Sequence, residues 1–309
     1  MRDRPALNIR PMIETDLSAT LVVRKIALEW LDRTQGREPQ PWRPTFPAAM
    51  QHILRTDPDG CWVAEMDGVL VGYAQALQRG DIWFLSQLFV LPDVHSLGVG
   101  EQLLARSQEY GRARKARVFS VVASASLVAQ SLYMRHGMFA RGVAYRMSGP
   151  IAPLLELPEP SGNRKKIVDC SGWQDRMAEL DRVVFGAERR QDHAFYLSGE
   201  LSSGEEQSFG LNREGNLAGY AYASEQNGGM IAPVAAYEAE DQLPLLRMAT
   251  EWLHGRGAET GSMWVISLNE TIMSALLAAK WRVQWSSFFL TSAPFGQFDR
   301  YQPSGGILL

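Results

Sequence analysis

The chain has 309 residues, 46% of them hydrophobic, which is enough to bury more than one core, so we expect two domains. A formal net charge of −3 argues against nucleic acid as the main partner, and the two cysteines, Cys61 and Cys170, lack neighbouring thiols or histidines that would indicate a disulfide framework or a metal site. No run approaches the length of a membrane span and residues 1–20 form no apolar leader, so we expect a cytoplasmic protein without a membrane partner.

In the first half, strand and helix patterns alternate. The expected order is strand, helix, helix, strand, strand, strand, helix, strand, helix, strand, and a turn at Asp67 and Gly68 joins the second and third strands. The expected elements are residues 7–11, 16–31, 46–55, 61–65, 69–77, 82–90, 101–110, 118–123, a helix around Tyr133, and 143–147.

Residues 82–100 form the most informative junction of the chain. The strand at its start is apolar apart from Ser86 and Gln87, which suits a strand covered on both faces. Gly98 and Gly100 then stand just before a helix. Glycines there let a ligand approach the backbone, and the N–H groups of the loop and the first helical turn bind anions. We therefore expect a ligand that carries phosphates.

Spacing decides between the kinds of phosphate loop. A dinucleotide-binding loop would need a third glycine at position 103, which is Leu103. A nucleotide P-loop would need Lys and then Ser or Thr where Glu101 and Gln102 stand. Both kinds are therefore disfavoured.

The pattern Val90-x-Pro92-x-x-His95-x-x-Gly98-x-Gly100 resembles the pyrophosphate-binding signature of the GNAT superfamily of acyl-CoA-dependent N-acyltransferases, V-x-P-x-x-[QR]-x-x-G-x-[GA]. His95 is the one departure, because the family has Gln or Arg there. The resemblance implies acetyl-CoA as co-substrate, bound by the loop and by backbone N–H groups at the end of the strand. The implied cofactor-binding residues of this region are Leu88, Phe89, Val90, His95, Ser96, Leu97, Gly98, Val99, Gly100 and Glu101.

A second pattern resembles the other half of the GNAT site. Residues 126–139, SLVAQSLYMRHGMF, match N-x-x-A-x-x-x-Y-x-x-x-G-F at the Ala, Tyr and Gly positions, whereas Ser126 replaces the Asn. By resemblance, Tyr133 is the acid that protonates the departing thiolate. The helix of this motif packs along the pantetheine arm, which adds Ser126, Ala129 and Ser131 to the implied cofactor-binding residues.

Four prolines and a Ser-Gly-Asn cluster interrupt the pattern around residues 150–165, which we predict to be a linker. The predicted domains are an N-terminal GNAT domain at 1–149 and a degenerate GNAT-like domain at 166–309. The predicted fold class is α/β (α+β), with two GNAT folds in tandem. Each is expected to have a mixed, mostly antiparallel central sheet, with a splayed central strand pair, flanked by helices.

The second half repeats the order of the first with a weaker site. Its expected elements are a strand at 166–168, a helix at 172–184, a hairpin of 208–211 and 217–224 that turns at Glu214 and Gly215, and a strand at 230–235. Residues 237–246 lack glycine and carry three acids, so they would repel a pyrophosphate. Asn269 stands at the family's CoA-contacting Asn, but Leu276 replaces the tyrosine. We interpret this half as a degenerate copy with a structural or substrate-shaping role.

The sequence leaves the catalytic base open. Four carboxylates are candidates, namely Glu29, Asp32, Glu65 and Asp81. His136 follows Tyr133 by three positions and fits a surface histidine near a helix end. Cys61 fits a small buried hydrophobe, so direct attack by the amine is expected without a covalent acyl-enzyme.

The acceptor is also open. We expect residues 34–47 to form a Pro-rich loop, which by resemblance borders the acceptor side of the site. Four aromatic residues could line this pocket or belong to the core: Trp30, Trp42, Trp83 and Phe84. The expected activity is acetyl-CoA-dependent N-acetyl transfer to a primary amine, with a small molecule preferred as acceptor. A peptide or protein amine is the alternative acceptor, and a non-catalytic acyl-CoA-binding sensor or interaction module is the alternative function. The oligomeric state, monomer or homodimer, is open.

Overall fold

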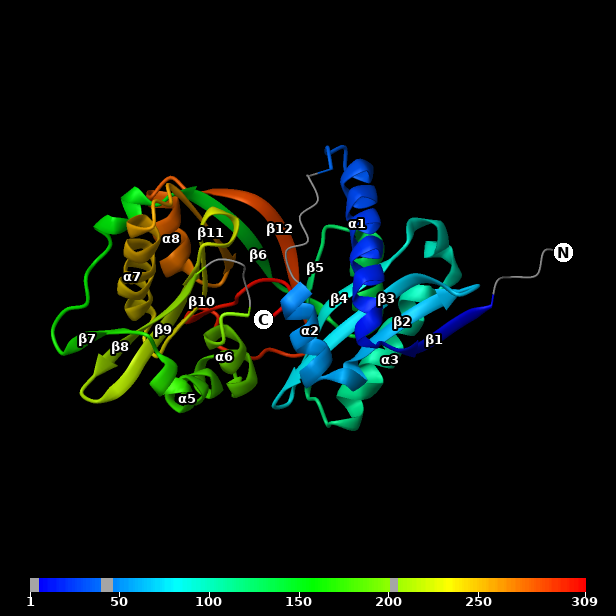
Figure 1. The fold of residues 1–309 in the computed structure, drawn as a ribbon, viewed down its shortest axis with the longest axis horizontal. Helices are drawn as coiled ribbons and strands as arrows, with labels where there is room; N and C mark the ends of the chain where they lie inside the picture. Colours follow the sequence, from blue (N-terminus) through cyan, green and yellow to red (C-terminus); the bar gives the residue numbers. More distant parts are fainter. Residues whose placement is uncertain (1–5, 40–46, 201–204) are drawn as a thin grey trace. The chain divides into compact units, whose positions relative to one another are not determined.

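Figure 1 shows the protein as a computed structural model, which describes residues 6–39, 47–200 and 205–309. The contacts within the chain divide it into two compact units. Unit 1 comprises Met1–Val121 and Ser126–His136, and unit 2 comprises Val122–Ala125 and Gly137–Leu309.

Unit 1 is a mixed sheet flanked by helices. Its strands are β1 (Leu7–Pro11), β2 (Cys61–Met66), β3 (Val69–Arg79), β4 (Ile82–Val90) and β5 (Val118–Ala123), and its helices are α1 (Leu17–Thr34), α2 (Pro47–Thr56), α3 (Val99–Ala113) and α4 (Leu127–Arg135). The strand order is β1-β2-β3-β4-β5, antiparallel except for the parallel pair β4 and β5. In Figure 1, α1 and α2 cross in front of these strands.

The hairpin and the central strand form as the sequence predicts. Asp67 and Gly68 have positive φ angles of 51° and 78°, the conformation that a two-residue hairpin turn needs. β4 and β5 have the predicted bounds, and α3 begins two residues before the predicted helix, at Val99. The predicted start of the second helix, Phe46, lies outside the described residues.

β4 and β5 separate part-way along their length. In the described register, their pairing ends at Leu85 opposite Val121, although β4 continues to Val90. The pairing of β4 with β3 also shifts register around Ser86. We call residues 86–90 the open edge of β4. This separation is the splay that the sequence predicts for the central strand pair.

Unit 2 is also a mixed sheet flanked by helices. Its strands are β6 (Phe139–Pro150), β7 (Arg164–Val168), β8 (Glu206–Arg213), β9 (Asn216–Ser224), β10 (Met230–Ala236), β11 (Thr260–Ile266), β12 (Arg282–Thr291) and β13 (Tyr301–Gln302), and its helices are α5 (Gln174–Val184), α6 (Arg190–Leu197), α7 (Gln242–Gly255) and α8 (Glu270–Ala278). The strand order is β12-β6-β11-β10-β9-β8-β7, and β13 pairs with β10. β10 and β11 are parallel, and the other pairs are antiparallel.

β6 follows α4 in the chain but lies in the sheet of unit 2, between β11 and β12. The chain thus leaves unit 1 after His136, ahead of the predicted domain boundary at residue 149. Ile151 and Leu154, in the predicted linker at 150–165, are fully buried in the core of unit 2. The division into two sequence repeats stays a prediction, because chain contacts and repeats need not share a boundary.

The two units repeat one another at their third strands. Gly72-Tyr73-Ala74 in β3 and Gly219-Tyr220-Ala221 in β9 stand at equal distances after their hairpin turns. The turn residues Asp67-Gly68 and Glu214-Gly215 all have positive φ angles. Each unit therefore has the mixed, mostly antiparallel sheet flanked by helices that the sequence predicts, and the fold class is confirmed.

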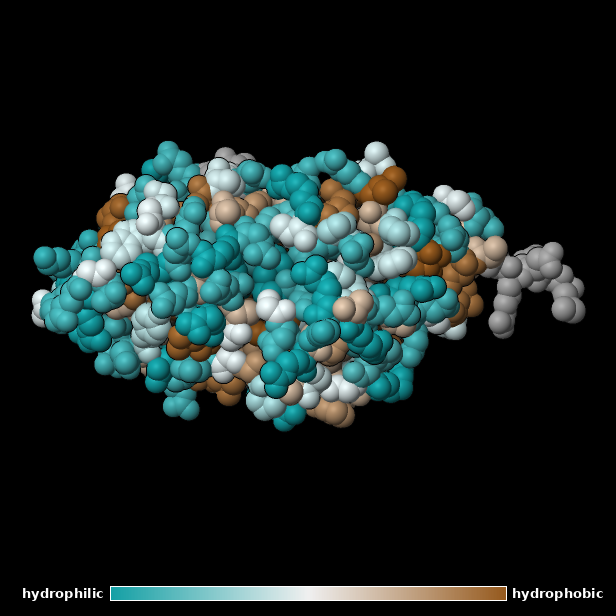
Figure 2. All heavy atoms as spheres, turned by 90° about the horizontal axis from the view of Figure 1, so that it is seen from below, coloured by the Kyte–Doolittle hydropathy of each residue, from teal (hydrophilic) through white to brown (hydrophobic). Residues whose placement is uncertain are grey.

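The face of the molecule shown in Figure 2 is mostly hydrophilic, and its apolar residues form small separate patches. Two exposed apolar side chains, Leu127 and Val128, lie at the start of α4, the helix that the sequence assigns to the pantetheine arm. Among the described residues, no helix combines the length and the hydropathy that a membrane span requires.

Candidate active site

The predicted phosphate loop leads from β4 into α3. Pro92–Leu97 form a short 3-10 turn, Gly98 has a φ of 74°, and α3 starts at Val99. Side chains with a Cβ rarely adopt this left-handed conformation, so Gly98 is the residue that the turn requires. The first N–H groups of α3 have no partner within the helix, and they lie at the positive end of its dipole. Helix starts of this kind are typical anion-binding sites.

Packing does not demand the second glycine of the loop, Gly100. A Cβ there would lie 3.7 Å from Val90 and 3.8 Å from Leu132, which are ordinary contact distances. At Gly72 in β3, by contrast, a Cβ would come within 3.1 Å of the Phe89 carbonyl oxygen. The protein interior therefore explains the glycine at position 72, whereas room for a ligand is a physical reason for the glycine at position 100.

α4 brings the second predicted motif to the loop. Ser126 caps this helix, because its hydroxyl oxygen accepts a hydrogen bond from the Ala129 N–H at 3.3 Å. At the other end of α4, Arg135 forms a 3.2 Å ion pair with Glu101 in the first turn of α3. The two patterns that resemble the GNAT site are therefore neighbours in unit 1.

Glu101 is an acid at the predicted phosphate site, and basic side chains surround it. His136 Nε2 lies 3.0 Å from its carboxylate, and His136 Nδ1 lies 2.8 Å from Gln108 Oε1. Hydrogen bonds from His136 and Arg135 lower the pKa of Glu101, so it is ionised and partnered at neutral pH. The sequence predicts a surface histidine at 136, but its side chain is only 15% exposed, because Glu101 and Gln108 hold both ring nitrogens.

His95, the departure from the family pattern, is held against β4 and α1. Its Nε2 donates to the Val90 carbonyl oxygen at 3.0 Å, and its ring meets Trp30 edge-on with the centroids 4.8 Å apart. These contacts hold the ring between the end of β4 and α1. Trp30 therefore belongs to the wall of the loop.

Tyr133, the predicted acid, has 5% of its surface exposed. Burial raises the pKa of its hydroxyl above the ordinary value, so the group is protonated at neutral pH, as an acid must be. Ser131 on the same helix is exposed, and its hydroxyl donates to the Leu127 carbonyl oxygen at 2.7 Å. The acceptor capacity of Ser131 is not used by this bond.

Sequence reasoning missed a buried polar chain on β3 and β4. Tyr73 donates to Gln87 Oε1 at 2.8 Å, and Gln87 Nε2 donates to Gln75 Oε1 at 3.1 Å. Gln75 Nε2 in turn donates to the Met50 carbonyl oxygen in α2 at 3.0 Å. We call Tyr73, Gln87 and Gln75 the polar chain. The Gly-Tyr-Ala sequence that recurs in both halves is the signal that marks Tyr73.

The Ser86 hydroxyl lies at the point where β4 leaves β5. Its oxygen is buried and has no hydrogen-bond partner among the described residues. A buried polar group without a partner costs about 1–3 kcal/mol, so a ligand that pairs with this hydroxyl would recover that free energy. Ser86 is therefore the residue of the open edge whose side chain lacks a partner within the described protein.

The four predicted bases are held by basic side chains. Glu29 pairs with Lys25 and Arg33, Asp32 with Arg37, Glu65 with Arg10, and Asp81 with Arg117. None of these ion pairs involves the polar chain. The assignment of a base among them therefore gains no support from the structure.

Two further residue groups behave as core. Trp83 and Phe84 are fully buried, and the Trp83 indole N–H donates to the Ser107 carbonyl oxygen at 3.0 Å, whereas Trp42 lies outside the described residues. Cys61 is buried, which raises the pKa of its thiol to about 12, so no thiolate is available at neutral pH.

In the part of the chain that the structure describes, no cluster of three or more His, Cys, Asp or Glu could hold a metal ion.

The counterpart of the loop in unit 2 is built differently. A short 3-10 turn, Ala239–Asp241, carries two of the three predicted acids and leads directly into α7 at Gln242. Asn269 is fully buried, accepts a hydrogen bond from the Ile272 N–H at 2.9 Å, and donates to Gln242 at 2.7 Å. The asparagine that sequence analysis singles out is therefore engaged inside the protein.

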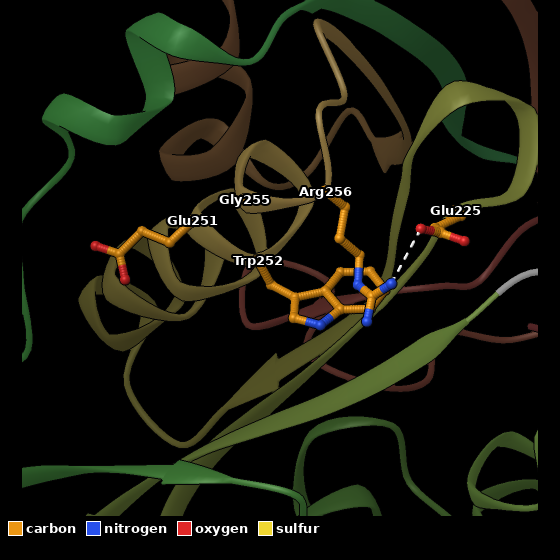
Figure 3. A pocket seen from close by; sticks show the side chains of 5 residues that line it. All are labelled: Glu225, Glu251, Trp252, Gly255 and Arg256. Atoms are coloured by element: carbon orange, nitrogen blue, oxygen red, sulfur yellow. Dashed lines mark hydrogen bonds and ion pairs between the residues drawn. The ribbon is translucent and has the colours of Figure 1, made fainter.

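Unit 2 also has an open hollow of about 590 Å³ at the end of α7 (Figure 3). Arg256 lies over the Trp252 ring, 4.6 Å from its centroid, and forms ion pairs with Glu225 and Glu205. The charge of Arg256 is therefore balanced within the protein. The hollow lies at the opposite end of α7 from the counterpart of the phosphate loop.

Residues 26–138 match the Acetyltransferase (GNAT) family. A relative from Salmonella typhimurium, named aminoglycoside N(6')-acetyltransferase type 1, is 33% identical over 103 residues, which represent 70% of that protein and 29% of this chain. The chain therefore belongs to the GNAT acetyltransferase family, and it is an N-acetyltransferase.

Solved structures show the tandem fold. A candidate acetyltransferase from Pyrococcus horikoshii has a TM-score of 0.70 at 18% identity, covering 100% of this chain and 98% of that chain. A tandem GNAT protein from the clavulanic acid biosynthesis pathway has a TM-score of 0.61 at 16% identity, covering 94% of this chain and 99% of that chain. At these identities the likeness shows the fold alone, and that fold is two GNAT domains in tandem, as predicted.

Proposed function

We propose that unit 1 transfers the acetyl group of acetyl-CoA to the primary amine of a small molecule. The observation that carries the proposal is the meeting of three features in one unit: the open edge of β4, the loop at Gly98, and the helix of Tyr133. The relative named as an aminoglycoside acetyltransferase supports a small-molecule amine as the acceptor.

The residues of unit 1 fit acetyl-CoA. The N–H groups of the loop and of the first turn of α3 would bind its pyrophosphate, and the Ser86 hydroxyl offers an unused partner on the open edge. When bound, acetyl-CoA supplies the thioester whose acyl carbon the amine attacks. The proposed binding set is Leu88, Phe89, Val90, His95, Ser96, Leu97, Gly98, Val99, Gly100, Glu101, Ser126, Ala129 and Ser131.

The chemistry that we assign to the chain is electrostatic and acidic. Backbone N–H groups of the open edge would hold the thioester carbonyl oxygen while negative charge develops on it. The amine nitrogen forms the new C–N bond as the C–S bond breaks, and Tyr133 gives its proton to the departing sulfur. Thiols titrate near a pKa of about 8.5, so this proton assists a leaving group that is already good.

Deprotonation of the acceptor is the harder step. An alkylamine with a pKa of about 10.4 costs about 4.6 kcal/mol to hold neutral at pH 7. Burial raises the pKa of Tyr73, so the polar chain carries no charge and cannot itself take this proton. We therefore assign the role of proton acceptor to water.

The test is release of free CoA from acetyl-CoA, followed with a thiol reagent. The acceptors are an aminoglycoside, a linear diamine and a lysine-containing peptide, with a sample without acceptor as control. We expect the rate to rise with at least one of the two small amines. A rate that rises only with the peptide would replace the small molecule by a peptide amine, and equal rates in all samples would contradict the proposal.

A further inference from the structure

β10 and β11 of unit 2 separate near their starts. Their described parallel register is Met230 opposite Ser262, and β10 then continues to Ala236. β13 enters beside β10 at this separation, where Gln302 pairs with Val234 and the preceding residue pairs with Ala235. Residues 297–309, the segment that contains β13, therefore lie in the strand splay of unit 2.

Gln302 connects the two separated strands. Its backbone pairs with β10, and its Oε1 accepts a hydrogen bond from the Ile266 N–H of β11 at 2.8 Å. Its Nε2 donates to the carbonyl oxygens of Tyr301 and Phe298 at 2.7 Å and 3.1 Å. The side chain is fully buried. Gln302 therefore provides hydrogen-bond partners to backbone groups of β10 and β11 at the point where the two strands separate.

The same segment covers the start of α7. Gln242, the first residue of that helix, donates to the Asp299 carbonyl oxygen at 2.7 Å. The Ala236 N–H donates to the Arg300 carbonyl oxygen at 3.0 Å, and Arg300 Nη1 donates to the Tyr237 carbonyl oxygen at 2.7 Å. In unit 1, the corresponding positions are the end of β4 and the phosphate loop.

A buried ion pair holds the far part of the segment. Arg189 lies 2.9 Å from Asp181, and its Nη1 donates to the Tyr301 hydroxyl at 2.6 Å and to the Leu309 carbonyl oxygen at 2.7 Å. Tyr220, the repeat counterpart of Tyr73, donates to Asp181 at 2.5 Å. The segment is thus anchored to the strand whose counterpart carries the polar chain in unit 1.

We infer that residues 297–309 act as a built-in occupant of the splay in unit 2 and close that unit to acyl-CoA. The segment pairs with β10, bridges to β11 and covers the start of α7, which are the three places that a GNAT site would offer to its co-substrate. A pantetheine arm could enter only after Gln302 left both strands and Arg189 lost its two bonds to the segment.

The test is hydrogen exchange of the full chain, followed by mass spectrometry without ligand and with CoA. We expect peptides that cover β10, β11 and residues 297–302 to exchange as slowly as those of β8 and β9, with no change on addition of CoA. Fast exchange at 297–302, or a change in β10 and β11 on addition of CoA, would overturn the inference. Peptides of unit 1 report separately whether CoA binds there.

A variant pair sharpens the measurement. Gln302→Ala removes the bridge between the strands, and Gln174→Ala, at an exposed position at the start of α5, is the matched control. We expect Gln302→Ala to speed exchange in β10 and β11 by about 10-fold or more, because local opening becomes easier. Equal exchange in the two variants would overturn the inference. The wild-type measurement stands even where Gln302→Ala does not fold.

Discussion

The two units open their sheets at corresponding strands and differ in what the opening meets. In unit 1, β4 leaves β5 after Leu85, and a glycine loop follows. In unit 2, Gln302 joins the separated strands from within the chain. Buried backbone groups need partners, so a GNAT fold that loses its co-substrate must satisfy its strand edges in another way. Under the inference that unit 2 is closed to acyl-CoA, residues 297–309 take over this role.

The two units also differ at the helix that follows the separated strand, α3 in unit 1 and α7 in unit 2. α3 follows a left-handed glycine, and its acid Glu101 is paired with Arg135 and His136. α7 follows the acidic turn Ala239–Asp241. The side-chain amide of its first residue, Gln242, donates a hydrogen bond to the Asp299 carbonyl oxygen in the segment 297–309. The start of α3 therefore has the features of an anion site, whereas the first side chain of α7 forms hydrogen bonds within unit 2.

The largest expected effect comes from making the loop of unit 1 resemble that of unit 2. Gly98→Glu places an acid at a left-handed position beside the start of α3. We expect acetyl-CoA affinity to fall by more than about 100-fold, because the charge opposes the pyrophosphate and the backbone is strained. Calorimetric titration measures this loss. Gly98→Ala, which adds the strain without the charge, should retain more affinity, and unchanged binding by Gly98→Glu would contradict the assignment.

A second substitution removes the acid that unit 2 lacks. Tyr133→Phe keeps the buried ring and deletes the hydroxyl, so turnover should fall by about 100-fold while acetyl-CoA affinity stays the same. Steady-state kinetics together with calorimetry separate the two quantities. Met134→Leu, at the neighbouring position of α4, is the control and should behave as wild type. Unimpaired turnover in Tyr133→Phe would remove this residue from its proposed role.

A smaller effect separates glycines kept for packing from glycines kept for a ligand. Gly100→Ala meets no close neighbour in the protein, so thermal stability should hold while acetyl-CoA affinity falls by about 10-fold. Gly72→Ala meets the Phe89 carbonyl oxygen and should instead lower the melting temperature. Thermal melts and titrations of both variants make the comparison. A Gly100→Ala protein with full affinity would mean that no ligand approaches that position.

The smallest expected effect is on the stability of unit 2 at acid pH. Burial alone would raise the pKa of Asp181, but the charges of Arg189 and His193 outweigh it and lower this pKa. The carboxylate therefore stabilises the fold above its unfolded pKa of about 3.9, and this contribution is lost as pH falls through the lower folded pKa. The difference in unfolding free energy between wild type and Asp181→Asn should narrow below about pH 4. Denaturant titrations across that range check it, and a constant difference would speak against the coupling.

Local signals were enough to predict the strand, loop and helices on which the candidate site of unit 1 is proposed. The strand ending before Pro92, the glycine loop at Gly98 and the helix around Tyr133 depend on residues close together in sequence, and each forms as predicted. The hairpin turn at Asp67-Gly68 is of the same kind. The roles of the individual site residues stay predictions.

The features that sequence could not give depend on distant residues. Gln302 meets Ile266 across 36 positions, and Arg189 meets Leu309 across 120. The His136 side chain is mostly shielded from solvent because it contacts Glu101, which lies on another helix. Periodicity reports burial within one element and contains no information about such partners. The entry of β6 into the sheet of unit 2 escaped prediction for the same reason.

The most direct test of the account is a calorimetric titration of the full chain with acetyl-CoA. The comparison of the two units predicts one binding site per chain, located in unit 1. Two sites would contradict closure of unit 2 by residues 297–309. No binding would contradict the proposal that the loop at Gly98 and the open edge of β4 hold acetyl-CoA.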